Sequence, residues 1–269
     1  DVSFQPYVAL AAWVLGRSAR ICYSRSESMR ASTKRHPSDI RLTVGCDETG
    51  RISGFVFDGI FNTGAYASWG PTVANRVPIH ASGPYTTKDY RANSVAVHTN
   101  APPAGAFRGF GVPQSAVAQE CAFDLLAEKL GMDRLAFRRL NALKNGMPTV
   151  TGQVFNSGVG IDDCFAALED SWHTAVASAA SFNQTAISDD SPWRRGVGIA
   201  SCWYGCGNTS LPNPSTMRFG ITADGRIVLH QGAMDIGQGA NTVITQIAAD
   251  ALGVPVHDVH ILGGDTDLT

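Results

Sequence analysis

The sequence predicts an α+β fold made of two mixed α/β subdomains, and three observations predict it. Residues 40–61 alternate apolar and polar side chains on either side of the turn-forming segment Asp47-Glu48-Thr49-Gly50, a pattern typical of a β-hairpin. Residues 118–126 and 244–252 repeat apolar side chains at helical spacing. Residues 173–193 are rich in Ser, Ala, Asn and Asp without a clear period, which favours a linker.

The two longest helices are predicted from their ends as well as from their period. The first begins near Pro113, because proline is favoured in a first helical turn, and Gly131 ends it as a C-cap residue does. The second covers residues 241–252 and is stopped by Gly253 and Pro255. Shorter helices are expected at residues 8–15, 133–143 and 162–173, the first of them buried.

The remaining strands are expected to be short. They cover residues 17–23, 94–98, 196–202, 217–222, 226–231 and 254–262. The pair Asp224-Gly225 joins two of them as a hairpin turn. With the linker as the boundary, we expect a first subdomain over residues 1–175 and the start of a second, incomplete one over residues 194–269.

Composition and charge restrict the classes of function. The chain has 269 residues, enough to bury a core, with 44% hydrophobic and 16% charged residues. Its net charge of −2 offers no basic surface, so nucleic acid is not expected as a partner. No apolar run approaches the roughly 18–20 residues that span a bilayer. Because the chain begins with neither Met nor a secretory leader, we expect a processed or trimmed chain, or a piece of a longer one.

The cysteines and histidines form no metal-ligand pattern in the sequence. None of the six cysteines belongs to a C-x-x-C pair, and reduced thiols of a cytoplasmic enzyme are the expected state. Cys202 and Cys206 are a near pair, and a metal role for them is the alternative interpretation. His257 and His260 fall in an expected strand, which would place them on opposite faces.

Two glycine-rich segments precede helices. The first glycine loop is Gly105-Ala106-Phe107-Arg108-Gly109-Phe110-Gly111, and the second glycine loop is Asp235-Ile236-Gly237-Gln238-Gly239. Backbone N–H groups and the positive end of the helix dipole face such a loop, so it is suited to binding an anion. Neither loop matches G-x-x-x-x-G-K-[ST] or a dinucleotide-binding G-x-G-x-x-G. A plain turn is the alternative interpretation of each loop.

In addition to the two glycine loops, two arginines are candidate site residues. Arg108, between Phe107 and Phe110, has a planar guanidinium that suits bidentate contact with phosphate. A surface or interface arginine bonded to backbone carbonyls explains it equally. Arg76 lies in an apolar neighbourhood, where a charge needs a partner, and a structural salt bridge is the alternative to a ligand-binding role.

At the first glycine loop, followed by Pro113-Gln114, the chain resembles the xanthine oxidase and aldehyde oxidoreductase family of molybdenum hydroxylases. Other stretches fit the family in the expected order along essentially the whole chain. They are Val8-Ala9-Leu10-Ala11-Ala12 with Gly16-Arg17, Asn62-Thr63-Gly64-Ala65-Tyr66-Ala67-Ser68-Trp69-Gly70, Thr99-Asn100, Arg195-Gly196-Val197-Gly198 and Gly237-Gln238-Gly239.

The resemblance implies a cofactor and a set of site residues. In this family, molybdenum is held by the dithiolene sulfurs of a pterin and not by protein side chains, and we expect the pterin as a cytosine dinucleotide. The resemblance gives Arg76 the role of orienting the substrate and Phe110 that of an aromatic ring beside it. The cofactor-binding residues that it implies are Phe107, Arg108, Gly109, Gly237, Gln238 and Gly239.

The resemblance also implies that parts of the site are missing. The family's catalytic glutamate, a general base, would follow Thr269, and a glycine-rich motif ending in glutamate, as well as a glutamine near the metal, would precede Asp1. A second substrate-facing aromatic residue would fall near Gly207 and Asn208, where this sequence has none. Trp203 and Tyr204 are close in sequence without aligning cleanly. The chain alone is therefore expected to be catalytically incomplete.

The function implied is a hydroxylase that inserts water-derived oxygen into a C–H bond of an N-heteroaromatic compound, xanthine- or nicotinate-like, or of an aldehyde. Its expected partners are the remaining molybdopterin-binding segments and domains or subunits with iron–sulfur clusters and FAD. A non-catalytic assembly or scaffold segment that retains the fold is the main alternative, although a scaffold has no need of Arg76, Arg108 and Phe110. An unrelated phosphate-binding α/β enzyme is a third.

Overall fold

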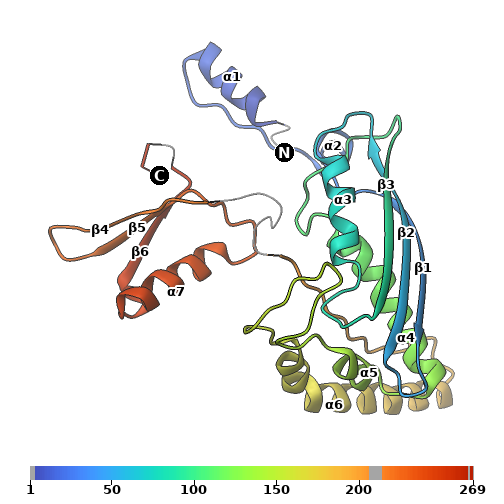
Figure 1. Ribbon diagram of the computed structural model, residues 1–269. Helices are drawn as coiled ribbons and strands as arrows, with labels where there is room; N and C mark the ends of the chain where they lie inside the picture. Colours follow the sequence, from blue (N-terminus) through green and yellow to red (C-terminus); the bar gives the residue numbers. More distant parts are fainter. Residues whose placement is uncertain (1–3, 206–213, 266, 269) are drawn as a thin grey trace. The chain divides into compact units, whose positions relative to one another are not determined.

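The computed structural model describes residues 4–205, 214–265 and 267–268. Its chain divides into two compact units, Asp1–Tyr204 and Gly205–Thr269 (Figure 1). Each unit contains helices and a three-stranded mixed sheet, which confirms the predicted α+β class. Within the described residues, no helix is both long and apolar enough to cross a membrane.

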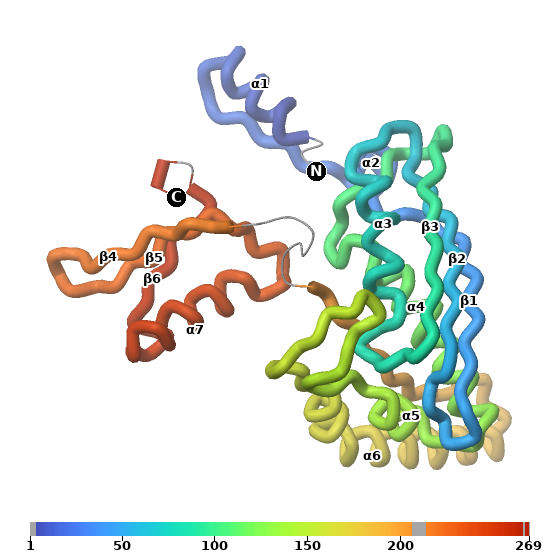
Figure 2. Tube along the Cα trace, in the orientation of Figure 1, coloured from blue at the N-terminus to red at the C-terminus, as the bar shows by residue number. Residues whose placement is uncertain are grey.

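The sheet of the first unit is built on the predicted hairpin. Strands β1 (Ser38–Cys46) and β2 (Ile52–Gly64) are antiparallel. Asp47 closes the turn, because its carboxylate accepts hydrogen bonds from the backbone N–H groups of Thr49 (2.9 Å) and Arg51 (3.0 Å). Strand β3 (Asp89–His98) pairs in parallel with β2, so the order is β1-β2-β3 (Figure 2). This strand begins earlier than the predicted start at residue 94.

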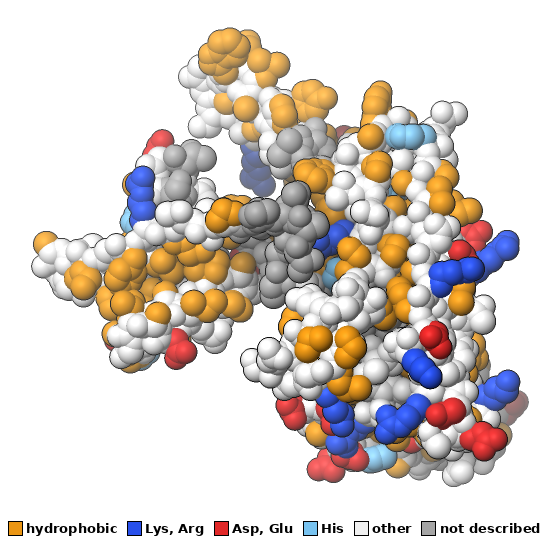
Figure 3. All heavy atoms as spheres, in the orientation of Figure 1, with side chains coloured by type: hydrophobic (Ala, Val, Ile, Leu, Met, Phe, Trp, Pro, Cys, Tyr) orange, Lys and Arg blue, Asp and Glu red, His pale blue; other side chains and the backbone are white. Residues whose placement is uncertain are grey.

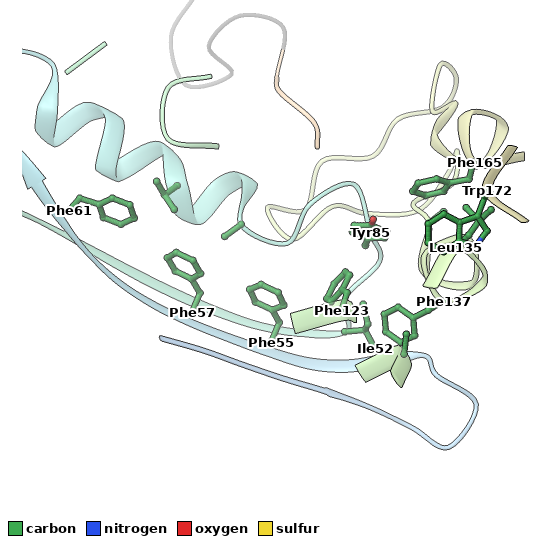
Figure 4. Packing of buried hydrophobic residues seen from close by; sticks show 14 of the residues in the cluster. Ile52, Phe55, Phe57, Phe61, Tyr85, Phe123, Leu135, Phe137, Phe165 and Trp172 are labelled. Atoms are coloured by element: carbon green, nitrogen blue, oxygen red, sulfur yellow. The ribbon is translucent and has the colours of Figure 1, made fainter. Parts of the chain in front are cut away.

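Two helices cover one face of this sheet. Helix α3 (Gly70–His80) connects β2 to β3 and packs on both, and α4 (Val112–Leu130) packs on α3 and on β1. Phe55, Phe57 and Phe61 of β2 point toward these helices and are fully buried (Figure 4). The predicted start and C-cap of α4 are confirmed, since Gly131 has the left-handed conformation with φ of 64°. Helix α3 was not predicted from the sequence.

The helix α5 (Arg134–Asn141) confirms the prediction at residues 133–143. Its Arg138 has a fully buried side chain, whose Nε donates to Glu120 at 2.6 Å and whose Nη2 lies 2.9 Å from Asp124. Tyr85 donates its hydroxyl to Glu120 at 2.9 Å. Burial, followed by the charge of Glu120, raises the pKa of Tyr85 above its ordinary value. A charged pair of this kind is stable inside a protein because hydrogen bonds surround it.

The predicted linker at residues 173–193 is wrong. Helix α6 (Ile161–Ser188) continues through most of it. Its buried residues recur every seven positions, which keeps one narrow face toward the core. They are Phe165, Trp172, Ala179 and Ala186. Alanine has the highest helix propensity, so this stretch stays helical although its apolar face is narrow.

Three further predictions in the first unit are wrong. Helix α1 (Gln5–Leu15) exists, but none of its residues is buried, and Trp13 is 82% exposed. Residues 17–23 form no strand, and helix α2 (Arg25–Ala31) follows them, begun by a capping box between Ser24 and Glu27. Residues 196–202 form no strand, because Val197 and Ile199 pack against the core of the first unit and not in a sheet.

The second unit confirms its predicted hairpin and helix. Strands β4 (Arg218–Ile221) and β5 (Ile227–Gln231) are antiparallel, and β6 (Val259–Gly263) pairs in parallel with β5. Helix α7 (Ala240–Leu252) ends at Gly253, and a short 3-10 helix (Val256–Asp258) precedes β6. The core of this unit is small, comprising Leu229, Ala249 and Val259 with partly buried neighbours. Many hydrophobic side chains of this unit and of α1 are exposed (Figure 3).

Candidate functional site

The first glycine loop is a pair of tight turns that leads into α4. The N–H of Phe110 donates to the carbonyl of Phe107 at 2.7 Å, and that of Val112 to Gly109 at 2.9 Å. Gly109, Phe110 and Gly111 have φ of 93°, 45° and 100°. Such angles suit glycine, while at Phe110 they carry about 1 kcal/mol or more of strain. Strain of this kind persists where the surroundings hold the backbone, as they do at many ligand sites.

The end of this loop packs directly on α3. A Cβ atom at Gly111 would lie 2.8 Å from Cγ2 of Val77 and 3.0 Å from the carbonyl oxygen of Val73. Only glycine permits this approach. Val77 follows Arg76 in α3, so the fold brings the loop of Phe107, Arg108 and Phe110 against the helix that carries Arg76. These two segments, which in the sequence only the family resemblance connects, are thus neighbours in the fold.

Arg35, which was not predicted from the sequence, contacts the first glycine loop. Its guanidinium carbon lies 4.8 Å from the ring centroid of Phe107, a cation–π contact. A Cβ atom at Gly109 would lie 3.5 Å from its Nη1. Burial lowers the pKa of Arg35. Arg35 falls in no periodic pattern, so the sequence carried no signal for it.

Buried polar atoms beside the loop lack hydrogen-bond partners among the residues that the structure describes. They are Nη1 of Arg35, a donor, and Oε1 of Gln114, an acceptor in the first turn of α4. A buried polar atom without a partner is destabilising, and most such atoms in native proteins are satisfied. A polar group with donors and acceptors, such as a pterin, fits this place beside the loop. Nη1 of Arg35 could donate a hydrogen bond to such a group, and Oε1 of Gln114 could accept one from it.

Arg76 lies half-buried in α3, beside an aromatic ring. The guanidinium carbon is 5.4 Å from the ring centroid of Tyr204. Phe107 is 41% exposed and the side chain of Arg108 is also exposed, so both remain accessible on the surface of the loop. Phe110 is partly buried. The first unit thus holds five of the eight site residues predicted from the sequence.

The second glycine loop is bonded to its own side chains. The carboxylate of Asp235 accepts from the N–H groups of Gly237 (2.7 Å) and Asn241 (3.2 Å). Gln238 accepts from the N–H of Ile236 at 2.6 Å and donates to the carbonyl of Met234 at 3.0 Å. Gly237 and Gly239 have φ of 93° and 83°. The N–H groups that were expected to face a bound anion are therefore partly engaged by an internal carboxylate.

Metal-ligand chemistry from side chains is not seen in the described ranges, which hold no group of three or more His, Cys, Asp or Glu residues suited to a metal ion. Cys206, the expected neighbour of Cys202, lies outside the described residues. His257 belongs to the 3-10 helix and His260 to β6, so the expected strand begins later than residue 254.

Comparisons with known proteins show the family of the chain. The molybdopterin cofactor-binding domain matches residues 1–142 in one family model and residues 166–269 in another. The nicotinate dehydrogenase large molybdopterin subunit of Eubacterium barkeri is 40% identical over 161 residues, covering 60% of this chain and 38% of its own length. A probable xanthine dehydrogenase component of Bacillus subtilis is 33% identical over 267 residues, which cover 99% of this chain and 35% of that protein.

A solved structure is similar over the whole chain. The aldehyde oxidoreductase from Desulfovibrio desulfuricans aligns with a TM-score of 0.78 and 26% identity, covering 100% of this chain and 29% of its own. The two family models and the fold define a molybdopterin-binding region. The chain belongs to the molybdenum hydroxylase family, as a part of that region. It spans about a third of the length of the curated relatives that it matches.

Proposed function

We propose that the protein to which this chain belongs is a molybdenum hydroxylase that inserts water-derived oxygen into a C–H bond of an N-heteroaromatic compound or an aldehyde. The observation that carries the proposal is the packing of Gly111 on Val77, which joins the first glycine loop to the helix of Arg76. Membership of the molybdenum hydroxylase family supports the type of reaction proposed. The similarity to a nicotinate dehydrogenase protein supports the N-heteroaromatic class, although the match covers only 60% of this chain.

The proposed cofactor is molybdopterin with molybdenum, in the cytosine dinucleotide form. Phe107, Arg108 and Gly109 would hold it through the first glycine loop, beside the unpartnered atoms of Arg35 and Gln114. Gly237, Gln238 and Gly239 would hold it through the second glycine loop. When bound, the cofactor takes up the electrons released by the substrate. The chain's own groups bind and orient, because the general base expected of the family is not in this sequence.

Arg76 and Phe110 are the proposed substrate-orienting residues. A guanidinium stabilises negative charge that develops on a heteroaromatic ring, and an aromatic side chain packs against a flat substrate. The electrons would leave through iron–sulfur and FAD partners, and the remaining molybdopterin-binding segments would complete the site. The five described cysteines are free thiols, the state expected in a reducing compartment, and they support a proposed cytoplasmic location.

The test measures cofactor content and turnover in the complete enzyme with its natural partners. We expect molybdenum and a released cytosine nucleotide in stoichiometric amounts. Arg76→Ala should lower kcat/KM for N-heteroaromatic substrates about 100-fold or more, comparable to the loss of one charge-stabilising donor. The matched control is Arg91→Ala, because Arg91 is 75% exposed and its ion pair with Asp58 is 3.9 Å long.

A native complex without molybdenum would refute the proposed function. Unchanged turnover in the Arg76→Ala enzyme with every candidate substrate would favour the scaffold alternative. In that case Arg76 and the first glycine loop would serve only the packing of the first unit.

A further inference from the structure

A cluster of ring and guanidinium groups lies at the C-terminal half of α3. Arg76 and His80 are one helical turn apart and therefore share a face of the helix. The ring of Tyr204 stacks on the imidazole of His80, with centroids 5.3 Å apart and planes inclined by 12°. The same ring lies 5.4 Å from the guanidinium carbon of Arg76. A single aromatic side chain thus contacts both residues of the α3 face.

The segment that carries Tyr204 is fixed to the first unit by its neighbours. The hydroxyl of Ser201 lies 2.7 Å from that of Tyr85, inside the hydrogen-bonded network of Glu120. The indole N–H of Trp203 donates to the carbonyl of His80 at 3.3 Å, and its ring meets the imidazole edge-on at 5.7 Å. Because Tyr204 directly follows Trp203, these contacts hold it beside the last turn of α3.

The electrostatics of the cluster suit a cation held against a ring. A guanidinium packed on a tyrosine face gains attraction and loses freedom to rotate. His80 adds no competing positive charge at neutral pH, because burial lowers its pKa and outweighs the hydrogen bond to the backbone of Arg76, which raises it. The imidazole Nδ1 also lies 3.1 Å from the carbonyl oxygen of Arg76, which ties the two residues together.

We infer that Tyr204 is a positioning residue that holds the guanidinium of Arg76 in the orientation needed to bind a negatively charged N-heteroaromatic substrate. This inference rests on the proposed function, in which Arg76 orients the substrate. Tyr204 acts through Arg76, and its role differs from that of Phe110, which is proposed to pack on the substrate itself. The positions where the resemblance implied a second aromatic residue, Gly207 and Asn208, lie outside the described residues.

The test compares Tyr204→Leu and Tyr204→Phe in the complete enzyme, with nicotinate as the anionic heteroaromatic probe and benzaldehyde as the neutral one. We expect Tyr204→Leu to raise KM for nicotinate about 3- to 5-fold, the effect of one partly exposed cation–π contact. Its molybdenum content and its KM for benzaldehyde should stay unchanged. Tyr204→Phe should behave as wild type, because it keeps the ring. Trp193→Leu, at a residue 74% exposed, is the control for loss of an aromatic side chain.

A double-mutant cycle tests whether Tyr204 acts through Arg76. In an Arg76→Ala background, Tyr204→Leu should have no further effect on KM for nicotinate, since both changes remove one interaction. An additive effect would overturn the inference, as would an unchanged KM or an equal rise for both probes. If Arg76→Ala itself left the KM for nicotinate unaltered, the substrate-orienting role of Arg76 in the proposed function would fail, and this inference with it.

Discussion

Gly111 packs so closely on Val77 that an added Cβ atom would lie 2.8 Å from the Cγ2 of that valine. The carbonyl oxygen of Val73, one turn earlier in α3, would lie at 3.0 Å. The backbone of Gly111 also has φ of 100°, which a side chain disfavours. This contact sets the distance between the first glycine loop and the helix that carries Arg76. A side chain at Gly111 would therefore disturb the candidate site.

Gly111→Ala is expected to impair both folding and turnover. The new methyl group would push the loop away from α3, since the nearest atoms include backbone that moves only with the helix. We expect a loss of about 2–4 kcal/mol in the free energy of unfolding, from steric overlap and strain together. Urea unfolding of the complete protein and kcat/KM of the holoenzyme measure the two effects.

The matched control is Gly131→Ala, at the C-cap of α4. Gly131 also has a positive φ, 64°, but an added Cβ would meet nothing within 4 Å. It should lose only about 1–2 kcal/mol through backbone strain and keep its turnover. Equal behaviour of the two variants would show that strain, and not the contact with Val77, makes Gly111 necessary.

Removing the buried charge of Arg138 is expected to destabilise the first unit strongly. Arg138→Leu leaves the carboxylate of Glu120 buried without its cation, which costs about 3–5 kcal/mol in the free energy of unfolding. Arg134→Leu should cost at most about 1 kcal/mol, because Arg134 is partly exposed and lies 3.7 Å from Asp124. Urea unfolding followed by tryptophan fluorescence compares the two. Similar losses would contradict a special role for the buried pair.

Asp235→Ala is expected to loosen the start of α7. The change removes the acceptor of the Gly237 and Asn241 N–H groups and should cost about 1 kcal/mol locally, as the loss of a helix cap does. Hydrogen exchange of residues 236–242 should then be about 5-fold faster. Asp224→Ala is the control, because Asp224 bonds Arg226 within the exposed β4–β5 turn. Unchanged exchange in the Asp235 variant would mean that other contacts order the loop.

Acid is expected to destabilise the first unit through two buried imidazoles. Burial lowers the pKa of His36 and of His80 below the ordinary value of 6.5. As the pH falls below 6.5, the unfolded chain therefore binds more protons than the folded chain. The free energy of unfolding decreases over this range, until both imidazoles are also protonated in the folded chain. The urea concentration at the midpoint of unfolding, measured from about pH 7.5 down to about pH 5, reports this loss of stability.

Variants separate the imidazoles from other titrating groups. His36→Asn and His80→Asn should each flatten the dependence of stability on pH in this window. His257→Asn should not, because the side chain of His257 is 84% exposed. If neither buried histidine changed the slope, carboxyl groups would have to account for acid sensitivity.

Features governed by neighbouring residues could be predicted from the sequence. The β1–β2 hairpin follows from alternation and from Asp47, and the end of α4 follows from the conformational freedom of Gly131. The narrow heptad of α6 was also present in the sequence, from Phe165 to Ala186, and was missed because alanine is a weak hydrophobic signal. Helix α3 was missed because Pro78 lies inside it, a residue that normally interrupts helices.

In the candidate site, too, some residues could be predicted from the sequence and others could not. The glycine pattern and the resemblance predicted the first glycine loop and Arg76 as parts of the site, but not Arg35, which lies over Phe107 without any signal in the local sequence. The parallel pairing of β2 with β3 and the contact of Tyr204 with Arg76 join residues far apart in the chain.

The sequence by itself determined the fold class, the hairpins, helices α4 and α7, and the family, since periodicity, caps and motifs depend on residues close together in the chain. Only the tertiary structure decided that α3 forms, that Gly111 seats the first glycine loop on it, and that Arg76 meets Tyr204. These features depend on packing between distant segments, whose energy no local pattern encodes.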